Sequence, residues 1–233
     1  MAADNEQSVV SLEPAQAGAK PTGGRRNGTR STVRYDARLA EIVDTTTALF
    51  ATQGYHGTSI QDISDATGLQ RGALYHYIKG KKELLFRIHE RFIEPLLAEA
   101  RLIEESDLAP DAAIRALAKA LMQDIDAYRN QVTVFLHEWK VIKDDPGAQS
   151  VREARREFEE IIERVLARGV RIGKFQVRDP HLEKFAFLGM INYTYQWYVP
   201  GGRYDADQVA SNFADIFLHG ISKTEPWTSA STE

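Results

Sequence analysis

Three side chains near residue 70 have the types and spacing to contact DNA bases. Arg71, Tyr75 and His76 lie on a short predicted helix that follows Gly68. The planar fork of an arginine can donate two hydrogen bonds to O6 and N7 of a guanine, so Arg71 is the residue we expect to read a base. Another short helix precedes the glycine. Two short helices joined by a tight turn have the form of a helix-turn-helix, here over residues 58–81.

A compact set of helices must position these side chains. From Tyr35, apolar residues recur at i, i+3, i+4 and i+7, which predicts a helix that ends at Gly54. Thr58 and Gln61 have the spacing of a capping box, so a second helix of about two turns is predicted to start there and to end at Gly68.

A long fourth helix is predicted from Lys81, with a kink at Pro95, and the chain stays helical beyond residue 108. No alternating β pattern occurs, so the sequence predicts an all-α protein with a three-helix head on a larger helical body. The later predicted helices span residues 110–128, 130–143, 147–172, 180–198 and 205–220. The predicted divisions are a disordered basic arm (1–33), the head (34–80), the body (81–222) and a tail (223–233).

Composition excludes several functions. The chain has no cysteine, so disulfides, thiolate nucleophiles and cysteine-based zinc sites are absent. No apolar run reaches the roughly 20 residues of a membrane span, and no signal peptide is evident, so a cytoplasmic protein without membrane association is expected. Residues 20–89 hold eleven Lys/Arg and six Asp/Glu, a balance of +5, whereas the whole chain carries −4. This asymmetry favours nucleic-acid binding by the basic part, although an unevenly charged surface is an alternative.

Residues 35–86 resemble the DNA-binding head of the TetR family of bacterial transcription regulators. The resemblance rests on fixed residue types across three helices, with Ile78 where Phe is usual and Gly80 where Ser is common. The matching segments are Phe50 to Gly54, Thr58-Ser59-Ile60-Gln61-Asp62-Ile63-Ser64, Gly68, and Leu74-Tyr75-His76-Tyr77-Ile78-Lys79-Gly80-Lys81-Lys82-Glu83-Leu84.

The resemblance implies that a palindromic double-stranded operator is bound by a homodimer. It places Thr58 and Lys81 on phosphates, the third helix in the major groove, and Tyr77 on the DNA backbone or the groove wall. A core aromatic of the head is the alternative for Tyr77. The implied DNA-binding residues are Thr58, Ser59, Gln70, Arg71, Gly72, Tyr75, His76, Tyr77 and Lys81.

Family resemblance also implies that the last two helices form a dimer bundle and that the middle helices enclose a pocket for a small hydrophobic effector. The segment from Trp197 to Gly202 is similar to one in regulators of steroid and fatty-acid breakdown that respond to acyl-CoA thioesters, although residues 180–198 offer a phosphate only Lys184. Among the possible classes of effector, we rank a bulky hydrophobic metabolite or acyl-CoA first and a xenobiotic second. Candidate pocket residues are Tyr128, Phe135, His137, Glu138, Trp139, Phe158, Phe187, Tyr195 and Trp197, for each of which ordinary core packing is the alternative.

An enzyme is not expected. His137-Glu138 has the start of a zinc-protease motif, but Val141 stands where the second histidine is needed, and no nucleophile, phosphate-loop or dinucleotide motif is present. We therefore predict no catalytic residue, no metal and no cofactor. A purely structural helical dimer is the other alternative, and it leaves the basic head unexplained.

Overall fold

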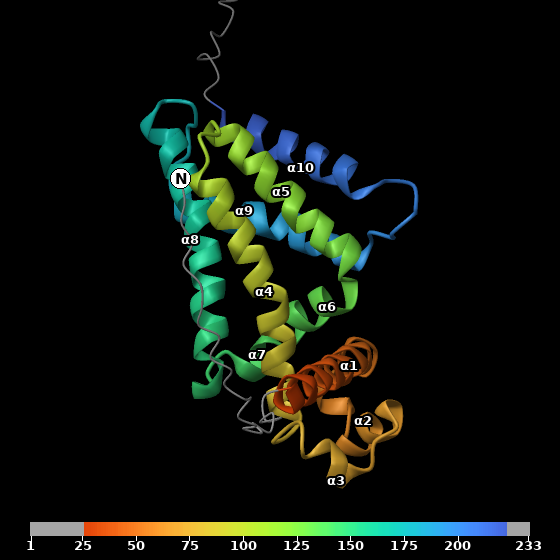
Figure 1. Cartoon of the computed structure of the whole chain (residues 1–233). Helices are drawn as coiled ribbons and strands as arrows, with labels where there is room; N and C mark the ends of the chain where they lie inside the picture. Colours follow the sequence, from red (N-terminus) through yellow and green to blue (C-terminus); the bar gives the residue numbers. More distant parts are fainter. Residues whose placement is uncertain (1–25, 223–233) are drawn as a thin grey trace, which may run out of the picture. The chain divides into compact units, whose positions relative to one another are not determined.

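The computed structural model describes residues 26–222, and its regular elements there are helices, with one isolated bridge between Phe175 and Ser222 (Figure 1). The predicted all-α fold is confirmed. No helix within 26–222 is long and apolar enough to cross a membrane. Most of the predicted arm and the whole predicted tail lie outside the described residues.

Helix α1 (Arg26–Gly57) begins earlier than the sequence predicted. The chain divides into two units after Arg38, and the described part of the first unit, residues 26–38, is helical throughout. The structure describes residues 26–33, which the sequence predicted to be disordered, as part of this helix. Adding residues to an existing helix is far easier than nucleating one, so the stable helix after Tyr35 can extend backward through a polar segment that contains Gly28.

Left-handed glycines end the helices of the head. Gly54 (φ 76°) interrupts α1, and Gly68 (φ 66°) caps α2 (Ile60–Thr67), as the sequence predicted. Side chains with a Cβ rarely adopt this conformation, so glycine fixes both stops. Helix α3 (Arg71–Leu74) follows three residues after the end of α2, and the chain then continues in tighter turns through Tyr77.

The body matches the predicted helices with two exceptions. The predicted helix 130–143 is broken at Glu138, and 180–198 tightens into a 3₁₀ turn after Asn192. Pro95 lies inside a helix that continues past it. The elements are α4 (Lys81–Glu105), α5 (Pro110–Ala127), α6 (Arg129–His137), α7 (Trp139–Ile142), η1 (Pro146–Ala148), α8 (Gln149–Arg171), α9 (Pro180–Asn192), η2 (Tyr193–Gln196) and α10 (Ala206–Ile221).

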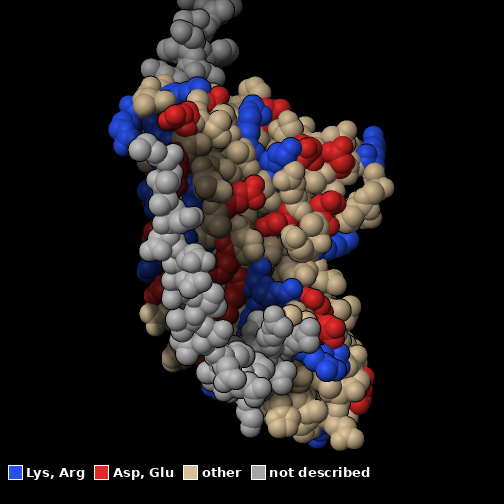
Figure 2. Space-filling view, viewed as in Figure 1, with Lys and Arg blue, Asp and Glu red and all other residues tan. Residues whose placement is uncertain are grey.

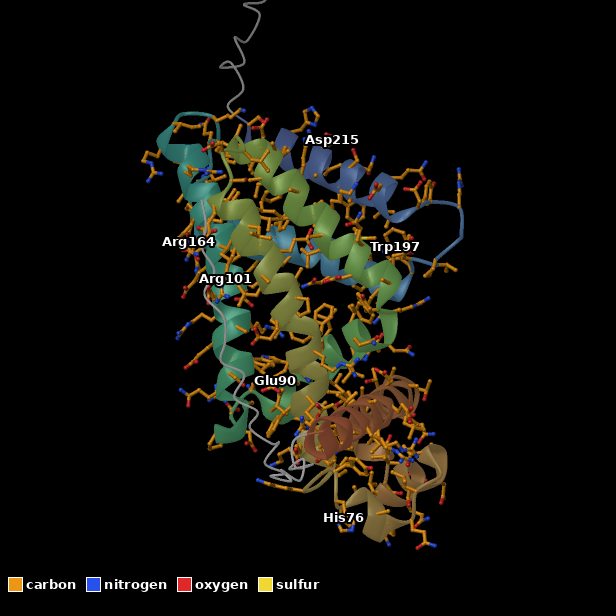
Figure 3. The ribbon with its side chains drawn as sticks, viewed as in Figure 1. His76, Glu90, Arg101, Arg164, Trp197 and Asp215 are labelled. Carbon is orange, nitrogen blue, oxygen red and sulfur yellow. The ribbon has the colours of Figure 1, made fainter. Side chains whose placement is uncertain are left out.

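Helix α5 packs against α10, and α4 packs against α8 (Figure 1). Two bidentate ion pairs also join α4 to α8: Arg101 donates to Glu157 at 2.6 Å through both nitrogens, and Arg164 donates to Glu104 at 2.6 and 2.9 Å. Both arginines are labelled in Figure 3. Figure 2 shows basic and acidic side chains interspersed over the drawn face of the body. The pairs reinforce an interface made mainly by apolar packing.

The core of the head continues into the body. Ile42 and Phe50 of α1 belong to the same buried cluster as Leu84 of α4, Val134 of α6 and Ile142 of α7. Residue 80 therefore separates the predicted head from the predicted body in the sequence, but one buried cluster contains residues from both. A shift of α4 or α6 must disturb the cluster that supports α2 and α3, because close-packed cores do not deform freely.

Candidate nucleic-acid interface and effector cavity

A capping box starts α2, one residue later than the sequence predicted. Ser59 accepts a hydrogen bond from the backbone N–H of Asp62 at 3.1 Å, and the Asp62 carboxylate accepts from the N–H of Ser59 at 2.7 Å. The pair predicted from Thr58 and Gln61 is wrong, because Thr58 is needed elsewhere. These bonds hold the pKa of Asp62 below its usual value, which keeps the cap charged.

The predicted groove-reading residues lie on one exposed surface around α3. Arg71, Tyr75 and His76 are exposed, and Gln70 caps the helix with an extended backbone. Figure 3 shows His76 projecting from the end of the head that lies away from α5 and α10. A Cβ added to Gly72 would meet no atom within 4 Å. This open position allows a duplex to approach the backbone closely.

Two of the predicted phosphate contacts are turned into the head instead. Thr58 is 1% exposed, and its hydroxyl donates to the carbonyl of Gly54 at 2.9 Å. The Lys81 ammonium donates to the carbonyls of Tyr55 at 2.5 Å and Thr58 at 2.7 Å, and it lies 4.2 Å from the centre of the Tyr55 ring. Both side chains therefore hold the turn between α1 and α2 in this structure, and their contact with phosphate stays a prediction.

Tyr77 is partly buried against the core of the head, which is the alternative that the sequence left open. Glu138, expected in the effector pocket, lies away from it. Its carboxylate accepts a hydrogen bond from the backbone N–H of Tyr55 at 2.8 Å, directly after the left-handed Gly54. Lys82 pairs with Asp145 at 2.8 Å on the same side of the head. Glu138 thus ties the break between α6 and α7 to the end of α1.

An apolar cavity lies among α4, α5, α6, α8 and α9. Its volume is about 30 Å³, room for one or two water molecules, so it is too small for an organic effector as it stands. Arg155, Glu159 and Asn192 are its polar lining residues. The apolar lining includes Phe92, Leu96, Ile125, Phe135, Phe158 and Leu188.

The nine predicted pocket residues do not form one site. Phe135 and Phe158 line the cavity, whereas Trp139 faces a separate groove with Arg155. Phe187 packs in the core against Phe217, with ring centres 5.3 Å apart. The remaining residues lie elsewhere: Tyr128 lines a hollow beside α4, His137 contacts the Tyr195 hydroxyl, and Trp197 lines a hollow on α10.

Arg155 is not among the predicted pocket residues, although its spacing in the sequence carries a signal. Val151, Ala154, Phe158 and Ile162 form the buried stripe of α8, and Arg155 occupies a position of that stripe. A cation at a core position of an amphipathic helix requires an explanation, because charges are rarely buried unless they are paired.

His89 of α4 is fully buried beside the cavity wall. Its Nδ1–H donates to the carbonyl of Leu85 at 2.8 Å, and its ring lies 5.3 Å from that of Phe135. Burial lowers the pKa of His89 to about 4, so the ring is neutral near pH 7.

We expect acid to destabilise the protein through His89. In the unfolded chain histidine titrates near 6.5, so between pH 6.5 and 4 only the unfolded chain binds the proton, and stability falls as the pH falls. From pH 7.5 to 5 the loss amounts to about 2 kcal/mol. Urea unfolding of wild type and His89→Gln at both pH values measures it. Burial raises the pKa of Asp124 to about 6, and Asp124 titrates in both proteins. The difference between the stability losses of wild type and His89→Gln therefore reports on His89 alone. Equal losses in the two proteins would contradict the prediction.

Known proteins resemble the chain over both of its parts. Residues 42–88 match the family model described as bacterial regulatory proteins, tetR family, and residues 107–221 match the tetracyclin repressor-like C-terminal domain. The HTH-type transcriptional repressor KstR2 of Rhodococcus jostii (strain RHA1) is 32% identical over 187 residues, which are 79% of this chain and 91% of that protein.

Solved structures agree. The ketosteroid transcriptional regulator KstR2 of Mycobacterium tuberculosis superposes with a TM-score of 0.75 and 27% identity, over 80% of this chain and 96% of that one. The TetR-family regulator PfmR of Thermus thermophilus superposes with a TM-score of 0.70 and 29% identity, over 78% of this chain and 99% of that one. The fold and the exposed α3 surface therefore define a helix-turn-helix transcriptional regulator. The chain belongs to the TetR family.

Proposed function

We propose that this chain represses transcription by binding a palindromic operator as a homodimer, and that a bulky hydrophobic effector, with acyl-CoA thioesters ranked first, releases it. The observation that carries the proposal is the exposed surface of Arg71, Gly72, Tyr75 and His76 on a head whose core is shared with the helices around an apolar cavity. Relatives in two bacteria that carry the name KstR2 are described as repressors, which supports repression over activation.

Exposed apolar side chains on α9 and α10 support a homodimer. Leu182 and Phe185 of α9, Tyr193 just after it and Ile216 of α10 are 64%, 49%, 66% and 56% exposed. We call these four residues the α9–α10 face. Helices α9 and α10 contact each other, so these side chains belong to adjacent elements. Exposed apolar patches of this kind mark interaction sites, and a second copy would bury them.

The structure offers a route from the cavity to the head. Four cavity-lining residues (Phe92, Leu96, Phe135, Phe158) come from α4, α6 and α8, and α6 ends at the residue before Glu138. A ligand larger than the cavity must separate these helices. Movement of α6 would act on Tyr55 through its bond to Glu138, and movement of α4 would act through Lys81. Either would change the spacing of the two α3 helices that a dimer presents.

Gly72→Ala tests the DNA-binding role without disturbing the fold. The added methyl group meets nothing within 4 Å, and alanine stabilises a helix by about 1 kcal/mol relative to glycine, so thermal stability should be equal or higher. The methyl group lies where the duplex backbone or bases would approach, so we expect operator affinity to fall about tenfold or more. Footprinting of the purified protein on genomic fragments identifies the operator, and titration of labelled operator measures the loss.

The alternatives predict different results. A structural helical dimer would show no salt-dependent DNA binding in either protein, whereas the proposed regulator requires a steep salt dependence. A xenobiotic-responsive regulator of an efflux system would bind DNA in the same way but would be released by hydrophobic drugs and not by acyl-CoA. Wild-type operator affinity in Gly72→Ala would contradict the placement of α3 in the groove.

A further inference from the structure

Arg155 is held in an unusual position for a charged side chain. It is 23% exposed and lies between two aromatic rings, with its guanidinium carbon 5.0 Å from the centre of Phe135 and 4.6 Å from that of Trp139. Its carboxylate partner is Glu159, at a long 3.3 Å from Nε. Among the described residues, nothing accepts a hydrogen bond from its buried Nη1.

This arrangement lowers the stability of the folded protein unless a ligand supplies the missing hydrogen-bond acceptor. A buried donor without an acceptor costs about 1–3 kcal/mol, and more when it is charged. Apolar residues of similar size in place of buried charges are often neutral or stabilising. The rings of Phe135 and Trp139 stabilise the cation but accept no conventional hydrogen bond. Nη1 therefore remains able to bind an oxygen atom that arrives with a ligand.

The position of Arg155 indicates what that ligand must look like. Arg155 and Glu159 line the apolar cavity and also a groove of about 580 Å³, so the pair forms the wall between them. On the groove side, Arg152 and Arg156 lie on the same helix as Arg155. Arg156 is 72% exposed and its Nε lies 3.6 Å from the Glu160 carboxylate, and Arg152 donates to the backbone carbonyl of Asp145. The groove also contains Glu153, whose carboxylate accepts a hydrogen bond from Gln149 at 2.9 Å.

We propose that Arg155 binds the junction between the two halves of the effector, an acyl group that enters the cavity and a phosphate-bearing head that lies in the groove against Arg152 and Arg156. This assignment rests on the proposed function and narrows it, since it requires a conjugate such as an acyl-CoA. The thioester carbonyl or an adjacent amide oxygen accepts from Nη1, and the arginines beside it attract phosphate. A free fatty acid would satisfy Arg155 but would leave the groove unused.

Binding measurements on a set of variants test the assignment. The probes are octanoyl-CoA, dodecanoyl-CoA and the CoA thioester of cholic acid, with octanoate and free CoA as the separate halves. Calorimetry gives each affinity for wild type, Arg155→Met, Arg155→Lys and the double variant Arg152→Ala/Arg156→Ala. Arg171→Met, an exposed arginine at the end of the same helix, is the matched control.

For the best thioester, we expect Arg155→Met to bind about tenfold or more weakly, while operator affinity without ligand stays at the wild-type value and the melting temperature is equal or higher. Arg155→Lys should be intermediate, and it serves as the readout if the methionine variant does not fold. The double variant should lose affinity for the thioester but not for octanoate. Arg171→Met should match wild type.

Three failures are distinguishable. If the wild type binds one of the thioesters and Arg155→Met binds it equally well, the assignment of Arg155 is overturned and the proposed function stands. If octanoate binds wild type as tightly as octanoyl-CoA does, the role of the groove is overturned. If the wild type binds no thioester but still binds its operator, acyl-CoA is not the effector class, and the proposed role of Arg155 at the junction is overturned as well.

Discussion

A variant with Phe185→Glu and Ile216→Glu is expected to be monomeric and to bind its operator about 100-fold or more weakly than wild type. Both side chains belong to the α9–α10 face and are about half exposed, so glutamate causes no burial of charge within one chain. In a dimer the same positions would bring four carboxylates into an apolar interface, which strongly disfavours association. A single head cannot gain from the second half-site, and linking two modules raises affinity by about 10²–10⁴.

Light scattering with size-exclusion chromatography gives the mass of each protein, and titration of full and half operators gives the affinity. Leu102→Glu is the matched control, because Leu102 is 69% exposed on α4 and lies outside the α9–α10 face. The control should remain dimeric and bind as wild type does. A double variant that stays dimeric would show that another surface joins the subunits.

Lys81→Met should reduce stability and DNA binding together. The ammonium supplies hydrogen bonds to two backbone carbonyls at the turn between α1 and α2, and methionine supplies none. Leaving these acceptors without their charged donor should lower the free energy of unfolding by about 2 kcal/mol. Because the turn sets where α2 starts, affinity for operator and random DNA should fall alike.

The adjacent lysine provides the control for this variant. Lys82 is 53% exposed and pairs with Asp145, and exposed pairs contribute about 0–1 kcal/mol, so Lys82→Met should change little. Chemical denaturation and operator titration of both variants make the comparison. If Lys81→Met kept full stability and lost only DNA affinity, Lys81 would be a phosphate contact after all.

The sequence predicted the head well, because glycines and apolar spacing determine it locally. Gly54 and Gly68 adopt the left-handed conformation that only glycine accepts easily, and Ile63 and Leu74 lie on the stripes that form its core. The stripes also predicted which helical faces are buried. They did not predict side-chain directions: Lys81 has the family spacing of a phosphate contact, yet carbonyls lie within its reach.

The proposed effector site was harder to predict, because a cavity is the space left between helices that are distant in the sequence. Of the nine aromatic and polar residues that the sequence predicts for the pocket, only Phe135 and Phe158 line the cavity. Most of its wall is aliphatic and indistinguishable from core. Arg155 was recognisable as a cation on an apolar stripe, but its meaning depends on Phe135 and Trp139, which lie elsewhere in the chain.

The small volume of the cavity would limit which molecules can act as effectors. The cavity, at about 30 Å³, has room for little more than water, which can occupy it with α4 and α8 in place. A larger molecule must push the helices apart against the Arg101–Glu157 and Arg164–Glu104 pairs, and part of its binding energy is consumed in doing so. If this cavity is the proposed effector site, the protein would respond only to molecules bulky enough to separate the helices, and short acyl groups, which gain less binding energy, would bind weakly.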